Sequence, residues 1–166
     1  MTNVAAQPNS SHWFETKQDI RGPGFSTRKD SHATEIDEMP KTKQLTISAE
    51  DRPGTLARIA KILGDSQVNI IAMNCATFGV QGAVQVVVDD VDKARESLDR
   101  LRLPYTEQDV LYVELQNVPG CLGELAGRLA AQNINVTAGY GTAVKGADKA
   151  CIVLRVSDLE KAARIH

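Results

Sequence analysis

Residues 45–74, LTISAEDRPGTLARIAKILGDSQVNIIAMN, decide the fold of this chain, because they return in altered form as residues 111–140, LYVELQNVPGCLGELAGRLAAQNINVTAGY. The Pro-Gly pair at residues 53–54 recurs at residues 119–120, which is 66 positions later (119 − 53). Later matches drift to a spacing of 68 (160 − 92), so two residues are inserted in the second copy. Two copies indicate a duplicated module rather than a longer repeat array.

Each copy begins with the pattern of a half-buried strand followed by an amphipathic helix. Apolar and polar residues alternate through residues 45–50 and 111–116, and this period of two is typical of a strand. A helix is then expected, because apolar residues recur at i, i+3, i+4 and i+7, namely Leu56, Ile59, Ala60, Leu63 and, in the second copy, Leu122, Leu125, Ala126, Leu129.

The rest of each copy predicts two further strands, a second helix and, in the first copy only, a fourth strand. The strands are expected at residues 69–77, 84–88 and 105–110, and at residues 135–142 and 152–156. The second helix of the first copy starts near Asp90. The order βαββαβ predicts an α+β fold of the ferredoxin-like type. The second copy lacks its last strand, so this edge is either dispensable or covered by another element or chain.

The chain is expected to divide into three parts. Residues 1–40 are polar, have no sustained apolar period and predict a disordered tail. Residues 41–109 form the first module and residues 110–166 form a truncated second module. We also hypothesise that translation begins at Met39.

The repeated motif that can carry chemistry is polar–x–Pro–Gly, at residues 51–54 and 117–120. We expect Asp51 and Asn117 to cap the helices that follow, with proline in the first turn and glycine allowing close approach of a ligand. The free N–H groups and the helix dipole would bind a carboxylate, and the polar side chain an ammonium group, which together describe an α-amino acid. The motif is also simply a good helix start, but its presence in both copies favours a ligand.

The two quoted stretches resemble the opening β-α-β of ACT domains, which are amino-acid-sensing regulatory modules of many biosynthetic enzymes. The resemblance covers roughly residues 43–165 and implies two tandem modules of a kind that pair side by side to extend their sheets, so a second copy of the chain is an expected partner. It further implies that the loop of one module and the second strand of its neighbour hold a small ligand. The matching positions are Asp51, Pro53, Gly54, Leu56, Asn69, Ile70, Asn117, Pro119, Gly120, Leu122, Asn135 and Val136.

Composition argues against nucleic-acid binding, membrane insertion and metal binding. Hydrophobic residues make up 42% and charged residues 24%, with a net charge of −2, so no electrostatic feature favours nucleic-acid binding. The longest apolar runs are too short for a membrane helix, and the first residues lack the apolar segment of a signal peptide. The cysteines Cys75, Cys121 and Cys151 lack metal-site or disulfide spacing. We therefore expect a cytoplasmic protein without metal or other cofactor.

No combination of residues predicts catalysis. The three histidines are His12, His32 and His166, and none lies within the repeated pattern. Gly139-Tyr140-Gly141 lacks the Gly-Lys-Ser/Thr ending of a phosphate-binding loop. Tyr140 either lines a ligand pocket or packs across strands.

Three functions follow in order of preference. The first is a non-catalytic sensor that binds an amino acid and regulates a partner or its own assembly, as a homodimer. The second is a regulatory or interaction subunit of a biosynthetic enzyme that has no ligand site of its own. The third and weakest function is that of an enzyme, because the sequence supplies no acid, base, metal or cofactor site that would support catalysis.

Overall fold

The computed structural model describes residues 39–78 and 81–165. Residues 1–38 of the expected tail lie outside the described residues, and the hypothesis that translation begins at Met39 stays a prediction. Strands and helices fall where the two periodicities predict them. They are β1 (Lys41–Glu50), α1 (Thr55–Asp65), β2 (Ile70–Phe78), β3 (Gln81–Val88), α2 (Val91–Arg100), β4 (Tyr105–Gln116), α3 (Cys121–Ala131), β5 (Val136–Ala143), β6 (Lys149–Val156) and α4 (Leu159–Ala162).

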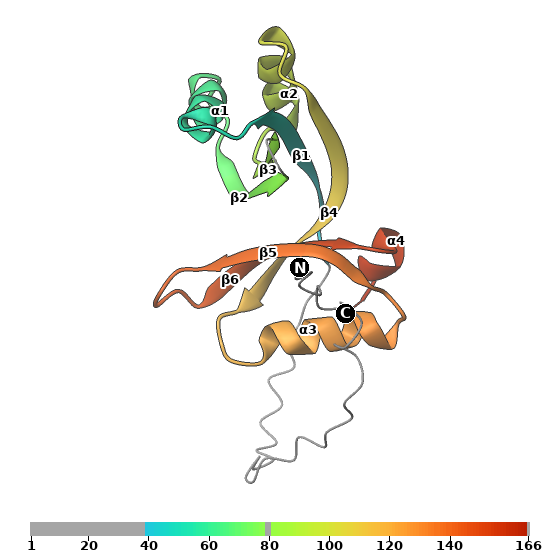
Figure 1. The fold of residues 1–166 in the computed structure, drawn as a ribbon. Coiled ribbons are helices and arrows are strands. Elements are labelled where there is room, and N and C mark those ends of the chain that lie inside the picture. The colour runs from blue at the N-terminus through green and yellow to red at the C-terminus, as the bar shows by residue number, and fades with distance from the viewer. Residues whose placement is uncertain (1–38, 79–80, 166) are drawn as a thin grey trace, which may run out of the picture. The chain divides into compact units, whose positions relative to one another are not determined.

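All strands join one antiparallel sheet in the order β2-β3-β1-β4-β6-β5 (Figure 1). Its first four strands have the order and connections of a ferredoxin-like unit. The second repeat adds β6 and β5, with α3 before them and the short α4 after them. The α+β class predicted from the sequence is therefore confirmed.

The strand β4 is one continuous strand where the sequence analysis expected two. Its residues 105–111 pair with β1, and its residues 111–116 pair with β6. The last strand of the first repeat and the first strand of the second repeat are thus the same strand. The physical reason is that residues 105–116 contain no glycine or proline that would end a strand.

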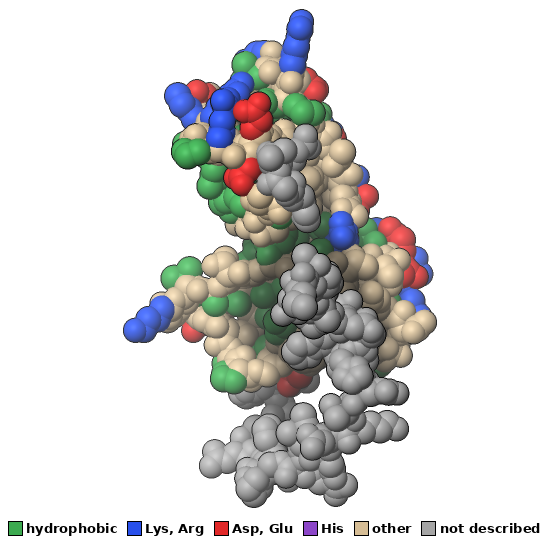
Figure 2. Space-filling model, in the orientation of Figure 1, with side chains coloured by type: hydrophobic (Ala, Val, Ile, Leu, Met, Phe, Trp, Pro, Cys, Tyr) green, Lys and Arg blue, Asp and Glu red, His purple; other side chains and the backbone are tan. Residues whose placement is uncertain are grey.

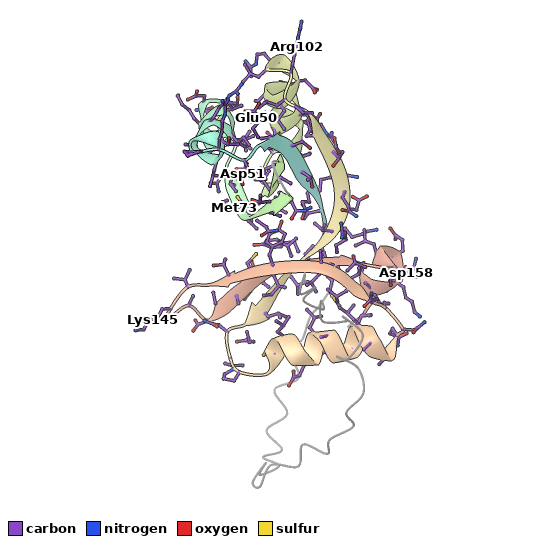
Figure 3. The ribbon with its side chains drawn as sticks, viewed as in Figure 1. Glu50, Asp51, Met73, Arg102, Lys145 and Asp158 are labelled. Atoms are coloured by element: carbon purple, nitrogen blue, oxygen red, sulfur yellow. The ribbon has the colours of Figure 1, made fainter. Side chains whose placement is uncertain are left out.

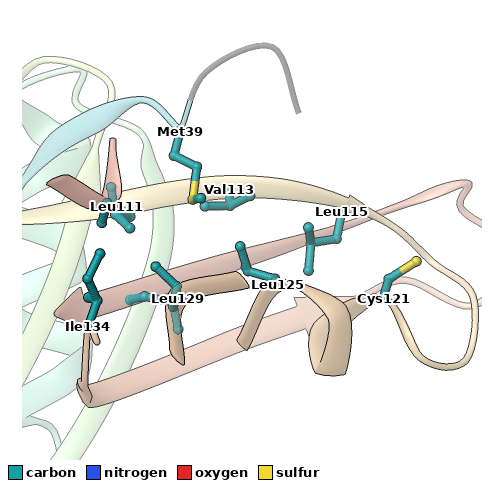
Figure 4. Close-up of a cluster of buried hydrophobic side chains, with 10 residues drawn as sticks. Met39, Leu111, Val113, Leu115, Cys121, Leu125, Leu129 and Ile134 are labelled. Atoms are coloured by element: carbon teal, nitrogen blue, oxygen red, sulfur yellow. The ribbon is translucent and has the colours of Figure 1, made fainter. Parts of the chain in front are cut away.

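The vacant fourth-strand position of the second repeat is partly filled by the residues just before β1. The N–H of Tyr112 donates to the carbonyl of Pro40 at 2.9 Å. The side chain of Met39 is 1% exposed and lies in the core of the second repeat (Figure 4). Met39 and Pro40 were expected to belong to the tail, and the structure corrects this. A flexible thioether packs well in an irregular apolar gap, which explains why ordered packing includes Met39.

Two hydrophobic cores lie between the sheet and its helices. The first joins β1 and β3 to Ile59 and Leu63 of α1 and to Ala94 and Leu98 of α2. The second joins Leu111, Val113 and Leu115 of β4 to Leu125 and Leu129 of α3 and to Ala162 of α4. Each fully buried Leu or Ile stabilises the fold by roughly 1.5–3 kcal/mol relative to exposure.

Both helix layers cover the same face of the sheet. Lys41 of β1 lies opposite Leu111 of β4, and Leu45, four residues after Lys41, points to the same side. Leu45 packs in the first core and Leu111 in the second. The sheet must therefore curl, with its helix-covered face outward, to serve both cores.

The opposite face, which we call the inner face, packs against itself. It includes Gln44, Asn74, Gln85, Val87, Val110, Tyr112, Tyr140 and Val153. The two outermost strands, β2 and β5, have Cα atoms within 8 Å of each other. Val87, Val110 and Val153 form a small third cluster there, so residues from both repeats meet on this face.

Candidate functional site

Both Pro-Gly pairs occupy the centre of a type II β-turn that leads into a helix. Gly54 has φ 92° and ψ −11°, and Gly120 has φ 103° and ψ −28°. This left-handed conformation is the one required at the third position of a type II turn, where glycine avoids the Cβ clash of other residues. In the first turn, the N–H of Thr55 donates to the carbonyl of Arg52 at 3.2 Å, and the second turn repeats this contact.

Asp51 and Asn117 do not cap these helices, which corrects the expectation from the sequence. The N-cap residues are Gly54 in α1 and Gly120 in α3, and neither helix has a side-chain cap. The type II turn separates the polar residue from the helix and takes its side chain out of reach of the first N–H groups. By contrast, the expected start of α2 is confirmed, because Asp90 accepts a backbone hydrogen bond at 3.0 Å.

The absence of a side-chain cap leaves helical N–H groups for a ligand. The second and third residues of α1, Leu56 and Ala57, have N–H groups without an acceptor inside the helix. Leu122 and Gly123 hold the same positions in α3. Together with the positive end of the helix dipole, such groups bind carboxylate or phosphate oxygens.

A cavity of about 440 Å³ opens beside the first turn. Its lining includes Glu50, Arg52, Gly54, Arg58 and, from the loop before β4, Leu103. Arg52 Nε lies 3.2 Å from a carboxylate oxygen of Glu50. Figure 3 places Glu50 at the end of β1, and Figure 2 shows charged side chains of both signs over the part of the surface that carries α1 and α2. The first turn therefore combines a helix N-terminus with cationic and anionic side chains.

Only some of the predicted residues of the first turn line this cavity. Pro53 and Gly54 line it. Asp51 lies against Gly82 of β3, and Leu56 has a 40% exposed side chain outside the cavity lining. The carboxylate that borders the cavity is that of Glu50, one residue before the predicted Asp51.

The predicted second-strand residues lie at the other end of the helices. Asn69 donates its N–H to a carboxylate of the β3–α2 loop at 2.8 Å, and Asn135 donates its N–H to Ser157 Oγ at 2.9 Å. Ile70 and Val136 follow as the first residues of β2 and β5. Because α1 or α3 separates these residues from the turn, the structure does not bring the two predicted halves of a site together within one repeat.

The second turn is attached to the β5–β6 hairpin. Asn117 Nδ2 donates to the carbonyl of Ala147 at 3.0 Å, and the N–H of Asn117 donates to the carbonyl of Asp148 at 2.8 Å. Within this hairpin Gly146 has φ 83°, as expected for its turn position. The amide of Asn117 therefore holds a loop in place.

The two turns also differ in charge. Arg52 is replaced by Val118, and Arg58 by Glu124, at the repeat spacing of 66 (118 − 52 and 124 − 58). Around the second turn, Pro119 is exposed, and the side chains of Val118 and Leu122 are each 52% exposed. The first turn carries two arginines beside acidic side chains, whereas the second is apolar with one acidic side chain.

Sequence reasoning missed Arg58 and Leu103 as lining residues. The reversal from Arg58 to Glu124 was visible in the aligned repeats and could have identified the first. No pattern in the sequence pointed to Leu103. It reaches the cavity because the N–H of Ser48 donates to the carbonyl of Pro104, which holds the loop before β4 against the end of β1.

An ion pair outside the first turn stabilises the fold. The pKa of Glu107 is lowered because the Arg95 guanidinium donates two hydrogen bonds of 2.6 Å to its carboxylate, which ties α2 to β4. Among residues 39–78 and 81–165, no group of three or more metal-binding side chains gathers. Within the same ranges, no helix has the length and apolar character needed to cross a membrane.

Comparisons with solved structures extend over both repeats. The crystal structure of protein BT0572 from Bacteroides thetaiotaomicron is similar with a TM-score of 0.71 and 28% identity, over 78% of this chain and 88% of that chain. The ligand-free regulatory subunit of aspartate kinase from Thermus thermophilus gives a TM-score of 0.58 at 14% identity, over 76% and 90%. That from Thermus flavus gives 0.52 at 16%, over 75% and 88%.

The identities of 14% and 16% show a shared fold and no more. No curated protein matches the chain. A family model described as the ACT domain matches residues 43–102, which run from β1 to the end of α2. Residues 43–102 are thus similar in sequence to the ACT domain, within an α+β fold that the chain shares with regulatory subunits of aspartate kinase.

Proposed function

We propose that this protein is a non-catalytic sensor that binds a free amino acid between ACT-type modules and regulates a partner or its own assembly. The observation that carries the proposal is the cavity at the first Pro-Gly turn, where uncapped N–H groups of α1 meet charged side chains. The match of residues 43–102 to the ACT domain supports the same function.

The chemistry of the first turn suits an α-amino acid. The N–H groups of Leu56 and Ala57 would receive the α-carboxylate, and the helix dipole would favour its charge. Glu50 and Arg58 both line the cavity, so the carboxylate of Glu50 would receive the ammonium group and Arg58 would add a positive charge for the ligand carboxylate. A volume of about 440 Å³ is within the range of small-molecule pockets.

A second copy of the chain would complete this site. The strands β2 and β5 form the two edges of the sheet, and an edge strand offers backbone groups for pairing. Ile71 and Met73 of β2 are 40% and 42% exposed, and Val136 of β5 is 37% exposed. Pairing of such edges in a homodimer would bring Asn69, Ile70, Asn135 and Val136 of one copy toward a turn of the other.

A partner enzyme in trans is the second part of the proposal. The Thermus proteins of similar fold are regulatory subunits of a kinase. By analogy, occupancy of the amino-acid site would alter contacts with a separate catalytic protein.

A screen of thermal stability against the common amino acids tests the proposal. A ligand present at about 100 times its Kd stabilises the folded state by roughly 2.7 kcal/mol, which raises the melting temperature of a small protein by several degrees. At least one amino acid is expected to produce this shift. If none does, the sensing function is wrong.

One observation favours the alternative of an interaction subunit without a ligand site. The surroundings of the second turn are exposed and apolar, with Val118, Leu122 and, in the attached hairpin, the 68% exposed Val144. Such side chains suit contact with another protein. This alternative predicts no response to any amino acid, together with loss of partner binding when Val118 and Leu122 are replaced by serine.

A further inference from the structure

The two repeats differ at equivalent positions of the inner face. Gln44 of the first repeat corresponds to Val110 of the second, and Asn74 corresponds to Tyr140, both at a spacing of 66 (110 − 44 and 140 − 74). The first repeat thus presents amide side chains where the second presents an aliphatic and an aromatic one. The two inner surfaces are complementary to each other and are not copies.

A hydrogen bond between Tyr140 and Gln44 joins the two complementary inner surfaces. The hydroxyl of Tyr140 on β5 donates to Oε1 of Gln44 on β1 at 3.1 Å. Gln44 is 4% exposed and, with Ser97, is one of the two buried polar residues in the described part of the chain. Burial raises the pKa of Tyr140 to about 12, so the phenol keeps its proton and can donate throughout the neutral range.

The rest of the inner contact is small and incompletely packed. Its buried apolar part consists of Val87, Val110 and Val153. A cavity of about 40 Å³ remains beside it, between Asn74, Gln85, Tyr140 and Arg155. Such a volume holds about one water molecule. A second hydrogen bond joins Arg155 Nη1 to Gln108 Oε1 at 3.4 Å. Three valines, the partly buried side chains around them and two hydrogen bonds are a smaller contact than either helix-covered core.

The shared strand β4, together with Met39 and Pro40 just before β1, is the connection about which the two repeats can reorient. Residues 105–111 are paired with β1, and residues 111–116 are paired with β6. A change of angle between the repeats would bend β4 where its partner changes, at Leu111. The inner face would open or close as this bend changes.

We propose that the hydrogen bond between Tyr140 and Gln44 is a latch on the inner face, which fixes the angle between the repeats. Gln44 lies on β1, which leads into the turn at residues 51–54, and Tyr140 lies on β5, whose start contains Val136. The latch therefore sets how the first turn is oriented relative to the second repeat. Its regulatory use rests on the proposed function: a ligand at the first turn that favours one angle would be felt in the second repeat.

Hydrogen exchange of the full chain without any ligand tests the latch. Tyr140→Phe removes the donor and Gln44→Met removes the acceptor with little change in volume. Each is expected to speed amide exchange roughly fivefold in both β2 and β5, because loss of one buried hydrogen bond favours an open inner face by about that factor. The double variant should exchange no faster than either single variant, since both remove the same bond.

Tyr112→Phe is the matched control. Tyr112 also packs beside the three valines of the inner face, but its hydroxyl faces Cys151 on β6 of the same repeat. The substitution keeps the ring and removes only this hydroxyl. Its loss should affect exchange in β4 and β6 and leave β2 unchanged. The amides of Leu63 and Leu129, in the two helix-covered cores, should keep their exchange rates in every variant.

Three results would overturn the latch. Faster exchange in β5 alone after Tyr140→Phe would make the bond a local contact, and equally faster exchange at Leu63 and Leu129 would make it a general stabiliser. Additive effects in the double variant would also contradict it. Because no ligand is present in this experiment, failure of the latch is distinguishable from failure of the amino-acid screen.

Discussion

Gly54 and Gly120 hold the same left-handed backbone conformation at the N-termini of α1 and α3. A Cβ on either glycine would meet no atom within 4 Å, so space does not explain the choice of residue. The positive φ explains why glycine is found here, because it is the angle that a type II turn requires at this position. The main effect of the duplicated Pro-Gly pair is therefore on the backbone, because the turn leaves the N–H groups at the start of the helix uncapped.

Replacing either glycine by alanine should destabilise the protein by about 1–2 kcal/mol, the cost of a side chain in the left-handed region. Gly127→Ala is the control, since Gly127 lies in the interior of α3 with open space around it. That substitution should stabilise the helix by roughly 0.5–1 kcal/mol. Urea unfolding of the three variants measures these changes. Equal effects of Gly54→Ala and Gly127→Ala would disprove the role of the turn geometry.

The position of Met39 gives a second prediction. Met39→Ala should reduce the free energy of unfolding by about 2–5 kcal/mol, because the side chain is 1% exposed in the core of the second repeat. Met73→Ala is the matched control at a 42% exposed position and should change it by less than about 0.5 kcal/mol. Chemical denaturation distinguishes the two. A Met39 variant as stable as the parent would mean that this residue is not part of the core.

The charge difference between the turns gives a third prediction, which depends on the proposed function. Arg58→Glu should weaken binding of an amino acid at least tenfold, because it places a negative charge beside the seat of the carboxylate. Glu124→Arg is the reciprocal change in the second repeat and should leave this affinity within about twofold if the first turn is the binding site. Calorimetric titration of both variants measures the ratio. A larger loss in the Glu124 variant would move the site to the second turn.

The partly buried tyrosines Tyr112 and Tyr140 predict a loss of stability at alkaline pH. The hydrogen bond to Cys151 raises the pKa of Tyr112 to about 12, and burial raises that of Tyr140 to about 12, above the ordinary tyrosine value of 10.0. A folded-state pKa raised above its unfolded value contributes stability that is complete below the unfolded pKa and is lost as the pH rises toward the folded pKa. Unfolding free energy should therefore fall between pH 10 and about 12. Tyrosinate absorbance of the native protein should rise later than that of the unfolded chain, and coincident curves would contradict these pKa values.

The strands, helices and Pro-Gly turns were predictable because they depend on local patterns. The alternation from Leu45 and the helical spacing from Leu56 specify which face each element buries. The left-handed Gly54 follows from turn chemistry once the turn type is known. The capping role assigned to Asp51 was wrong because sequence alone did not show that a full turn intervenes.

Contacts between distant segments were not predictable in the same way. The repeat suggested a boundary near Val110, yet β4 continues through it because each half finds a different partner strand. Met39 precedes the repeated pattern, so the sequence does not indicate that it is buried. Its place in the second core becomes evident only in the structure, where the residues before β1 lie along β4. Tyr140 and Gln44 are 96 residues apart, and their pairing depends on the curl of the whole sheet.

The most direct measurement is the backbone amide spectrum of the isotope-labelled protein during titration with the amino acid that stabilises it most. We predict saturating shifts of the amide resonances of Gly54, Leu56 and Ala57, because their N–H groups would bind the ligand carboxylate. A titration with every common amino acid that left these three resonances unmoved would contradict amino-acid binding at the first Pro-Gly turn.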